Sequence, residues 1–180
     1  MTYPVRQTVR VVLLNHRDEL LLMCTDDPRI GGIGENYKGR FWTLIGGQIE
    51  GGETILKAAA REVFEETGIA KENIEFGPVV WFEELDLVLR DGPTHIRHQF
   101  IVGRTRESRV TLAHLTEDEP EVVKRLAWFF LEQIVNSTET IYPLLLPSFV
   151  PPIIAMEYPE QPLDIGSQGQ AEKPQSRMGS

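Results

Sequence analysis

Three glutamates, Glu62, Glu65 and Glu66, follow one another at spacings that place their carboxylates on one side of a helix. Residues three and four positions apart share a helix face, so three negative charges would gather within little more than one turn. At roughly 6 Å and an effective dielectric of about 20, each pair repels by about 2–3 kcal/mol. A divalent cation relieves this repulsion, and a hard ion such as Mg²⁺ suits carboxylate oxygens. The alternative is the solvated acidic face of an ordinary amphipathic helix.

The segment around these glutamates carries the local signals of a helix. Thr54 can cap its start and Gly68 provides a left-handed stop, with good helix formers between them. At 3.6 residues per turn, one apolar arc is predicted to face a core, and it comprises Leu56, Ala59, Ala60 and Val63, with Phe64 at its edge. The acidic arc is predicted to lie next to this buried arc.

A glycine-rich loop precedes the helix and changes the interpretation of its acidic face. The pairs Gly46-Gly47 and Gly51-Gly52 flank Gln48-Ile49-Glu50, and Glu53 closes the loop. Glycines at this density let the backbone turn sharply and approach a ligand closely. Counted from Gly47, the order is Gly, five residues, Glu, seven residues, Arg-Glu-Val, one residue, Glu-Glu, one residue, Gly-Ile. This order resembles the complete Nudix box, so the chain is similar to Nudix hydrolases. It departs from the family pattern at Ile45, where family members often have proline.

The resemblance implies a Mg²⁺- or Mn²⁺-dependent pyrophosphohydrolase, in which water attacks phosphorus in a nucleoside diphosphate derivative. A metal-held water is a better nucleophile at neutral pH, which agrees with the acidic cluster. By the resemblance, Glu62, Glu65 and Glu66 would be metal ligands, and the backbone carbonyl of Gly46 would add another. Two more residues, Arg61 and Glu53, would pair and hold the loop against the helix.

The resemblance also implies a further glutamate beyond the box, as an extra ligand or the general base. The acidic run in residues 112–121 supplies the candidates, which are Glu117, Asp118, Glu119 and Glu121. Glu119 is our choice among them. The alternative is that this run only starts a helix or turn, where acids favour the amino end.

The substrate is less constrained than the reaction. Family members that act on ADP-ribose, coenzyme A or diadenosine polyphosphates carry a proline or tyrosine downstream of the box, and residues 83–87 have neither. This favours a nucleoside triphosphate, including an oxidised one; alternatives are a nucleotide sugar or a catalytically silent domain that senses nucleotides. Lys38 and Arg40, in a long loop, are predicted to lie near phosphate, and Trp81 could stack on a base.

The resemblance implies an α/β/α sandwich with a mixed β-sheet, and the strand-rich pattern around one strong helix fits it. Strands are predicted over Thr8–Leu14, Glu19–Cys24, Phe41–Ile45, Pro78–Arg90, His98–Thr105 and Val122–Phe130, the first two pairing as a hairpin. Short helices are predicted over Leu131–Thr138 and Tyr142–Phe149, the second followed by an extended arm.

Composition indicates one folded domain over residues 1–156 and a flexible polar tail over residues 157–180. The chain has 180 residues, of which 41% are hydrophobic, and its net charge is −9, which argues against nucleic acid and anionic membranes as partners. No signal peptide or transmembrane run is apparent, so a cytoplasmic protein is expected. The apolar, proline-rich residues 141–156 would need cover if exposed, and a homodimer is one way to provide it.

Overall fold

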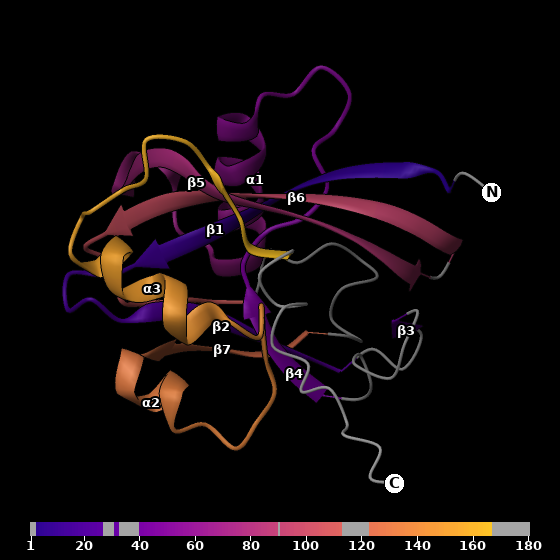
Figure 1. Ribbon diagram of the computed structural model, residues 1–180. Helices are drawn as coiled ribbons and strands as arrows, with labels where there is room; N and C mark the ends of the chain where they lie inside the picture. Colours follow the sequence, from indigo (N-terminus) through magenta and orange to yellow (C-terminus); the bar gives the residue numbers. More distant parts are fainter. Residues whose placement is uncertain (1–2, 27–30, 33–39, 90, 113–122, 167–180) are drawn as a thin grey trace, which may run out of the picture.

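The computed structural model describes residues 3–26, 31–32, 40–89, 91–112 and 123–166 (Figure 1). Within these residues the strands are β1 (Val5–Leu14), β2 (Leu20–Asp26), β3 (Gly31–Gly32), β4 (Arg40–Leu44), β5 (Ile74–Leu89), β6 (Gly92–Thr105), β7 (Val123–Phe129), β8 (Ile141–Tyr142) and β9 (Leu163–Asp164). The helices are α1 (Ile55–Thr67), the short 3₁₀ helix η1 (Lys71–Asn73), α2 (Leu131–Val135) and α3 (Leu146–Ile154).

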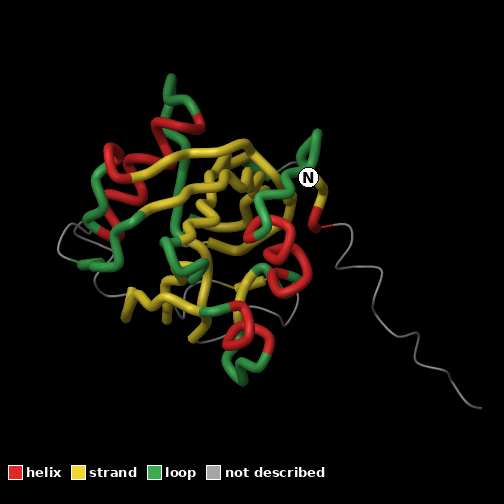
Figure 2. Tube along the Cα trace, turned by 90° about the vertical axis from the view of Figure 1, so that its left-hand side faces the viewer, coloured by secondary structure: helices red, strands yellow, loops and turns green. Residues whose placement is uncertain are grey.

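The strands form one mixed, curled sheet in the order β3-β5-β6-β1-β2-β4-β8, with β7 paired to β2 and β9 to β5. Helix α1 covers one face, and α2 and α3 cover the other, as Figures 1 and 2 show. The predicted α/β/α sandwich with a mixed sheet is therefore confirmed. Two apolar cores follow from this layering, one under α1 and one under α3.

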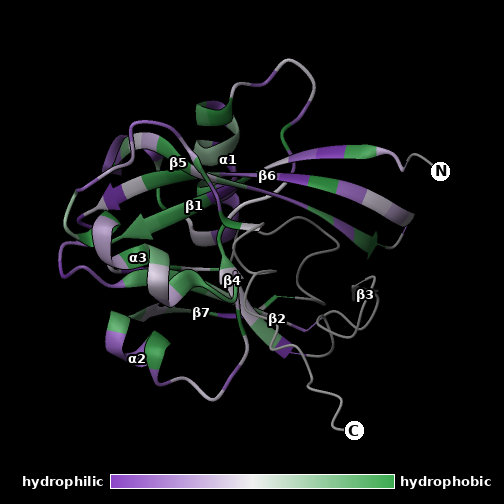
Figure 3. Cartoon of the chain, viewed as in Figure 1, coloured by the Kyte–Doolittle hydropathy of each residue, from purple (hydrophilic) through white to green (hydrophobic). Residues whose placement is uncertain are grey.

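The predicted antiparallel hairpin between the first two strands forms only at its turn. β1 meets β2 at a single pair, Leu14 with Leu20, and instead runs parallel to β6 from Val5–His95 to Leu14–Arg104. β2 pairs with β4 and β7. The reason is that the second half of β1 is apolar on both faces, as its hydrophobic colouring shows (Figure 3), which suits a central strand covered on both sides.

Helix α1 begins and ends as predicted, and it buries Ala59 and Val63 of the predicted apolar arc but not its remaining residues. Thr54 accepts a hydrogen bond from the amide of Lys57 at 3.2 Å, and Gly68 closes the helix in the left-handed region at φ 75°. Leu56 and Phe64, predicted to face the core, are 51% and 43% exposed. The buried residues are Ala58, Ala59, Glu62, Val63, Glu66 and Thr67. Two of the glutamates therefore face inward, which is tolerable because each has hydrogen-bond donors beside it.

The C-terminal region packs on the domain further than expected. Helix α3 contains Pro151 and Pro152 and buries Leu146, Val150 and Ile153 against its own sheet. The apolar residues 141–156 are thus covered by the chain's own sheet. The homodimer stays a prediction, and an exposed apolar stretch no longer argues for it. The first part of the predicted tail packs on the domain, because β9 pairs with β5 and Ile165 is 4% exposed in the core. Residues 167–180 of the predicted tail lie outside the described residues.

Among the residues that the structure describes, no helix is long and apolar enough to span a membrane.

Candidate active site

The glycine loop is held along β1 by backbone hydrogen bonds. The amide of Val9 donates to the carbonyl of Gly47 at 2.9 Å, and the amide of Val11 donates to that of Ile45 at 2.8 Å. Gly46, between them, has φ +138°, and a Cβ there would lie 2.1 Å from the carbonyl oxygen of Val9. Only glycine fits this position, so the loop path is fixed by its contact with β1.

Arg61 joins the loop to the acidic face of α1. Its Nε and Nη2 donate to the two carboxylate oxygens of Glu53, each at 3.0 Å, and Nη2 also donates to the carbonyl of Gln48 at 2.9 Å. Its Nη1 donates to Glu62 at 2.8 Å and to Glu65 at 3.1 Å. These hydrogen bonds lower the pKa of Glu53, and the surrounding carboxylates raise the pKa of Arg61. The single guanidinium of Arg61 therefore neutralises part of the negative charge of three carboxylates.

Glu62 and Glu66 are buried at the junction of helix and loop, at 6% and 4% exposed. The amide of Gly46 donates to Oε2 of Glu66 at 2.8 Å. Gly47 leaves room for Glu62, because a Cβ on Gly47 would lie 2.5–2.7 Å from that carboxylate. Burial raises the pKa of Glu62, and the Arg61 guanidinium counters this. The site thus concentrates negative charge where solvent is largely excluded, and a cation is bound strongly in such surroundings.

The donor chemistry fits a hard divalent cation. Glu62, Glu65 and Glu66 offer only oxygen, on one side of one helix, as Mg²⁺ or Mn²⁺ requires. In the described part of the chain, no three acidic, histidine or cysteine side chains are already arranged as a metal cage. The contacts explain this, since Nη1 of Arg61 bridges Glu62 and Glu65 while Glu66 is engaged by the Gly46 amide. Binding of a cation would require these carboxylates to turn.

Arg10 was not identified from the sequence, yet it reaches the same loop from the other side of the sheet. Its Nη1 donates to the carbonyl of Gly46 at 2.9 Å and lies 3.3 Å from that of Leu44. The available signal was a lone cation inside the apolar run of β1, residues 9–14. Since the resemblance makes the Gly46 carbonyl a metal ligand, Arg10 occupies the oxygen that a metal would use.

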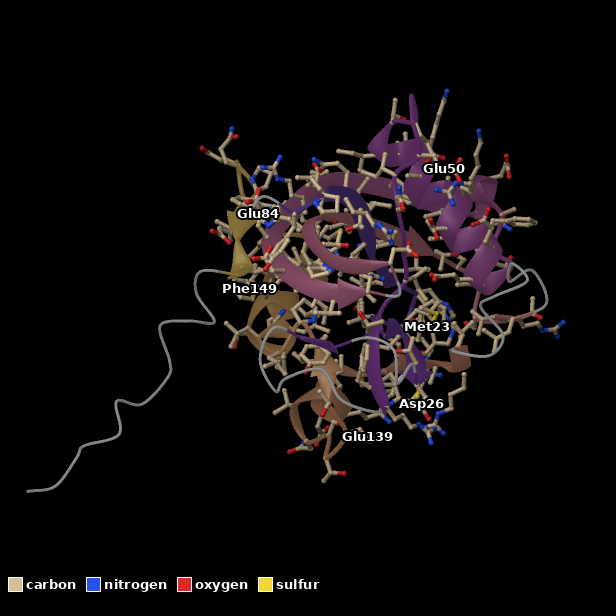
Figure 4. The ribbon with its side chains drawn as sticks, turned by 90° about the vertical axis from the view of Figure 1, so that its right-hand side faces the viewer. Met23, Asp26, Glu50, Glu84, Glu139 and Phe149 are labelled. Carbon is tan, nitrogen blue, oxygen red and sulfur yellow. The ribbon has the colours of Figure 1, made fainter. Side chains whose placement is uncertain are left out.

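A cavity of about 160 Å³ opens beside Arg10, lined from β1, β2, β4, β5, β6 and β8. Its walls are mainly apolar and aromatic, with Phe41, Phe100 and Tyr142 among them. Figure 4 looks onto this side of the molecule, with the glycine loop at Glu50 beside α1 and Phe149 of α3 across the sheet. The position suits a substrate whose phosphates lie at the loop and whose remaining part enters the cavity.

The structure brings together most of the predicted site. Six predicted residues meet where the loop packs on α1, and they are Gly46, Glu53, Arg61, Glu62, Glu65 and Glu66. Lys38 and Glu119 lie outside the described residues.

Two predicted substrate residues lie elsewhere. Trp81 is 1% exposed and its ring packs on Phe100 and Phe149, so it has no free face for a base. Arg40 begins β4, roughly 20 Å of extended chain from Gly46, and donates to Sγ of Cys24 at 3.1 Å. Pairing within the sheet directs both side chains into these contacts, so the substrate roles of Arg40 and Trp81 stay predictions that this geometry does not support.

The comparisons with known proteins agree with this geometry. The model of the NUDIX domain matches residues 4–147. The chain is 36% identical over 74 residues to the NAD-capped RNA hydrolase NudC of Photobacterium profundum, an alignment that covers 41% of this chain and 24% of that protein. The chain thus matches about a quarter of the length of this relative.

Solved structures with a similar fold cover most of the chain. The MutT protein from Methanosarcina mazei Go1 has a TM-score of 0.59 and 22% identity, over 87% of this chain and 97% of that one. The E. coli dihydroneopterin triphosphate pyrophosphohydrolase has a TM-score of 0.59 and 17% identity, over 87% and 99%. At these identities the likeness establishes the fold.

Proposed function

Because this chain belongs to the Nudix family, we propose that it is a pyrophosphohydrolase that splits a phosphoanhydride bond in a nucleoside diphosphate derivative. The favoured substrate is a nucleoside triphosphate, including an oxidised one, and the products would be a nucleoside monophosphate and pyrophosphate. A proline or tyrosine marking the other substrate classes is absent from residues 83–87. Two similar proteins are named for substrates that fit this general reaction: dihydroneopterin triphosphate for one and NAD-capped RNA for the other.

The observation that carries this proposal is the junction between the glycine loop and α1. Arg61 contacts Glu53, Glu62 and Glu65, while the Gly46 amide contacts Glu66, so the four glutamates at the fixed positions of the box are held at one place. A surface helix that was acidic only for solubility would not bury two of its glutamates. Their burial instead supports a role in holding cations against a polyphosphate.

Enzymes of this family generally use divalent metal ions. Glu62, Glu65 and Glu66 would hold such an ion here, and it would supply charge neutralisation of the diphosphate and an activated water. Two arginines of the chain would position the groups that bind the ion and the substrate. Arg61 fixes the carboxylates and the loop, which preorganises the site, and Arg10 brings a positive charge to the wall of the cavity.

The test is a chromatographic assay of the released nucleoside monophosphate, with Mg²⁺ or Mn²⁺, over nucleoside triphosphates, oxidised triphosphates, nucleotide sugars and dinucleotides. We expect turnover that needs the metal and is fastest with a triphosphate. Turnover confined to nucleotide sugars would show that these, and not nucleoside triphosphates, are the substrates. Measurable binding without turnover of any compound would contradict the enzymatic proposal and favour a nucleotide sensor.

Glu119 is proposed as the general base, and a matched pair of variants tests it. Glu119→Gln should lower kcat by about 100-fold or more, because a neutral amide accepts no proton at neutral pH. Glu121→Gln, two residues away, serves as the control. Equal activity of both variants and the wild type would exclude Glu119 from this role.

A further inference from the structure

Arg10 is a cation that stands between the glycine loop and the cavity. Its Nη1 donates to the carbonyl of Gly46 at 2.9 Å, and the amide of the same glycine donates to Oε2 of Glu66 at 2.8 Å. One residue of the loop therefore joins the guanidinium to a carboxylate of the acidic cluster. Burial raises the pKa of Glu62, and the charge of Arg10, together with that of Arg61, lowers it. The positive charge of Arg10 thus acts on the proposed metal ligands.

A second carboxylate, that of Glu83, shares the cavity with Arg10. Thr8, His98 and Glu83 form one row across β1, β6 and β5, and Arg10 is two residues from Thr8, so its side chain lies on the same face of the sheet. Burial raises the pKa of Glu83 to about 7, and the charge of Arg10 lowers it. Of the described residues that line the cavity, Arg10 and Glu83 are the two that carry a charge at pH 8, since burial keeps His98 neutral.

One guanidinium therefore lies between two sets of carboxylates. In the structure it is held on the loop side by the carbonyl of Gly46. A divalent cation bound by Glu62, Glu65 and Glu66 would repel it, because like charges in largely buried surroundings repel strongly. Glu83 then provides the carboxylate on the cavity side to which the guanidinium can turn, and a carboxylate is the partner that its planar fork fits best.

We infer that Arg10 is a positioning residue with two positions: on the Gly46 carbonyl without metal, and on Glu83 once a divalent cation occupies the acidic cluster. The inference rests on the proposed function for the metal site, and it adds that the cavity responds to metal binding. By turning, Arg10 would neutralise Glu83, so an anionic substrate would meet less repulsion in the metal-bound protein. Linkage makes this coupling reciprocal: Arg10 at the loop opposes the metal, and Glu83 favours it by drawing Arg10 away.

The test measures metal binding rather than turnover. Titration with Mn²⁺ at pH 8 without nucleotide, followed by electron paramagnetic resonance of the free ion, gives the dissociation constant. Arg10→Met keeps a long unbranched side chain and removes the charge, so we expect it to bind Mn²⁺ about 5-fold or more tightly than the wild type. Arg10→Lys keeps the charge and should bind Mn²⁺ about as the wild type does. Equal or weaker binding by a folded Arg10→Met protein would overturn the inference.

Glu83→Gln shifts the same equilibrium in the opposite direction and leaves the loop unchanged. It removes the cavity partner of Arg10, so Mn²⁺ should bind about 5-fold more weakly. Glu84→Gln is the matched control, because this neighbouring carboxylate is exposed and pairs with Arg97 at 2.9 Å, and it should bind Mn²⁺ as the wild type does. Combined with Arg10→Met, Glu83→Gln should change nothing further. A loss of equal size in both backgrounds would show that Glu83 does not act through Arg10.

A crystal structure of the wild type with Mn²⁺ checks the movement directly. The guanidinium of Arg10 should lie on Glu83, with its hydrogen bond to Gly46 broken. A guanidinium still on Gly46, with Mn²⁺ on the glutamates of the box, would overturn this inference and leave the proposed function standing. Failure of the wild type to bind Mn²⁺ would instead overturn the proposed metal site, and this inference with it.

Discussion

The guanidinium of Arg61 forms two parallel hydrogen bonds to Glu53, each at 3.0 Å, and thereby ties the glycine loop to helix α1. A planar fork that meets both carboxylate oxygens is specific to arginine, since a lysine ammonium presents a single point charge. The remaining Nη1 reaches Glu62 and Glu65, so the same side chain sets the loop path and the orientation of two carboxylates.

Arg61→Lys should therefore reduce turnover far more than a loss of one charge would. We expect kcat to fall by about 100-fold, because the carboxylates lose their positioning, and the free energy of unfolding to fall by about 1–2 kcal/mol. Steady-state kinetics and urea unfolding measure the two effects. Lys57→Ala, an exposed change on the same helix, is the control; equal losses in both variants would argue against a positioning role for Arg61.

Glu66→Gln removes a charge but keeps an oxygen that can accept from the Gly46 amide, so the fold should persist. Turnover should drop at least about 100-fold, since the amide is a poor ligand for a divalent cation. The melting temperature should also rise less with added Mg²⁺ than that of the wild type. Glu72→Gln, an exposed glutamate after the helix, should behave as the wild type does. Wild-type turnover in Glu66→Gln would contradict the metal-binding assignment.

Gly47→Ala tests the close approach of the loop to the helix. Its new Cβ would lie 2.5 Å from a Glu62 oxygen, so the carboxylate must move, and we expect kcat to fall by about 10-fold or more. Gly51→Ala is matched in chemistry and lies in the same loop, but nothing stands within 4 Å of its Cβ. It should retain activity. Similar activity in the two variants would show that Glu62 need not stay where it is.

Glu83→Gln tests the electrostatics of the cavity. Burial raises the pKa of Glu83 to about 7 from its usual 4.5, against the lowering influence of Arg10 and with a smaller raising influence from Asp164. Neutral His98 adds no charge near neutral pH. Because the pKa of Glu83 is higher in the folded than in the unfolded chain, its protonated form contributes to stability fully below pH 4.5. This contribution is lost as the pH rises through 7.

The expected consequence is a pH-dependent difference between the two proteins. Relative to the wild type, Glu83→Gln should gain unfolding free energy between pH 4.5 and 8, by up to about 3 kcal/mol, as the wild-type carboxyl ionises in its buried site. Urea unfolding at several pH values measures this difference, in which the titration of other groups cancels. A constant difference across that range would mean that Glu83 ionises normally.

Local sequence signals fixed the parts of this protein that depend on neighbours in the chain. Thr54 and Gly68 predicted the ends of α1, and the spacing of the box residues predicted which side chains meet at the loop. These features follow from helix geometry and from the conformational freedom of glycine, which operate over a few residues. The ordered spacing of the box was therefore sufficient to predict the family.

Tertiary structure decided the features that depend on which strands become neighbours. The parallel pairing of β1 with β6 brings Thr8 and Arg10 beside His98, and the pairing of β5 with β6 adds Glu83 to the same cavity. It also buries Trp81 in the core. No local pattern contains this information, because contacts between distant strands depend on how the whole chain covers its apolar surface. The sequence thus determined which residues meet at the glycine loop, and the folded sheet determined which residues line the cavity beside that loop.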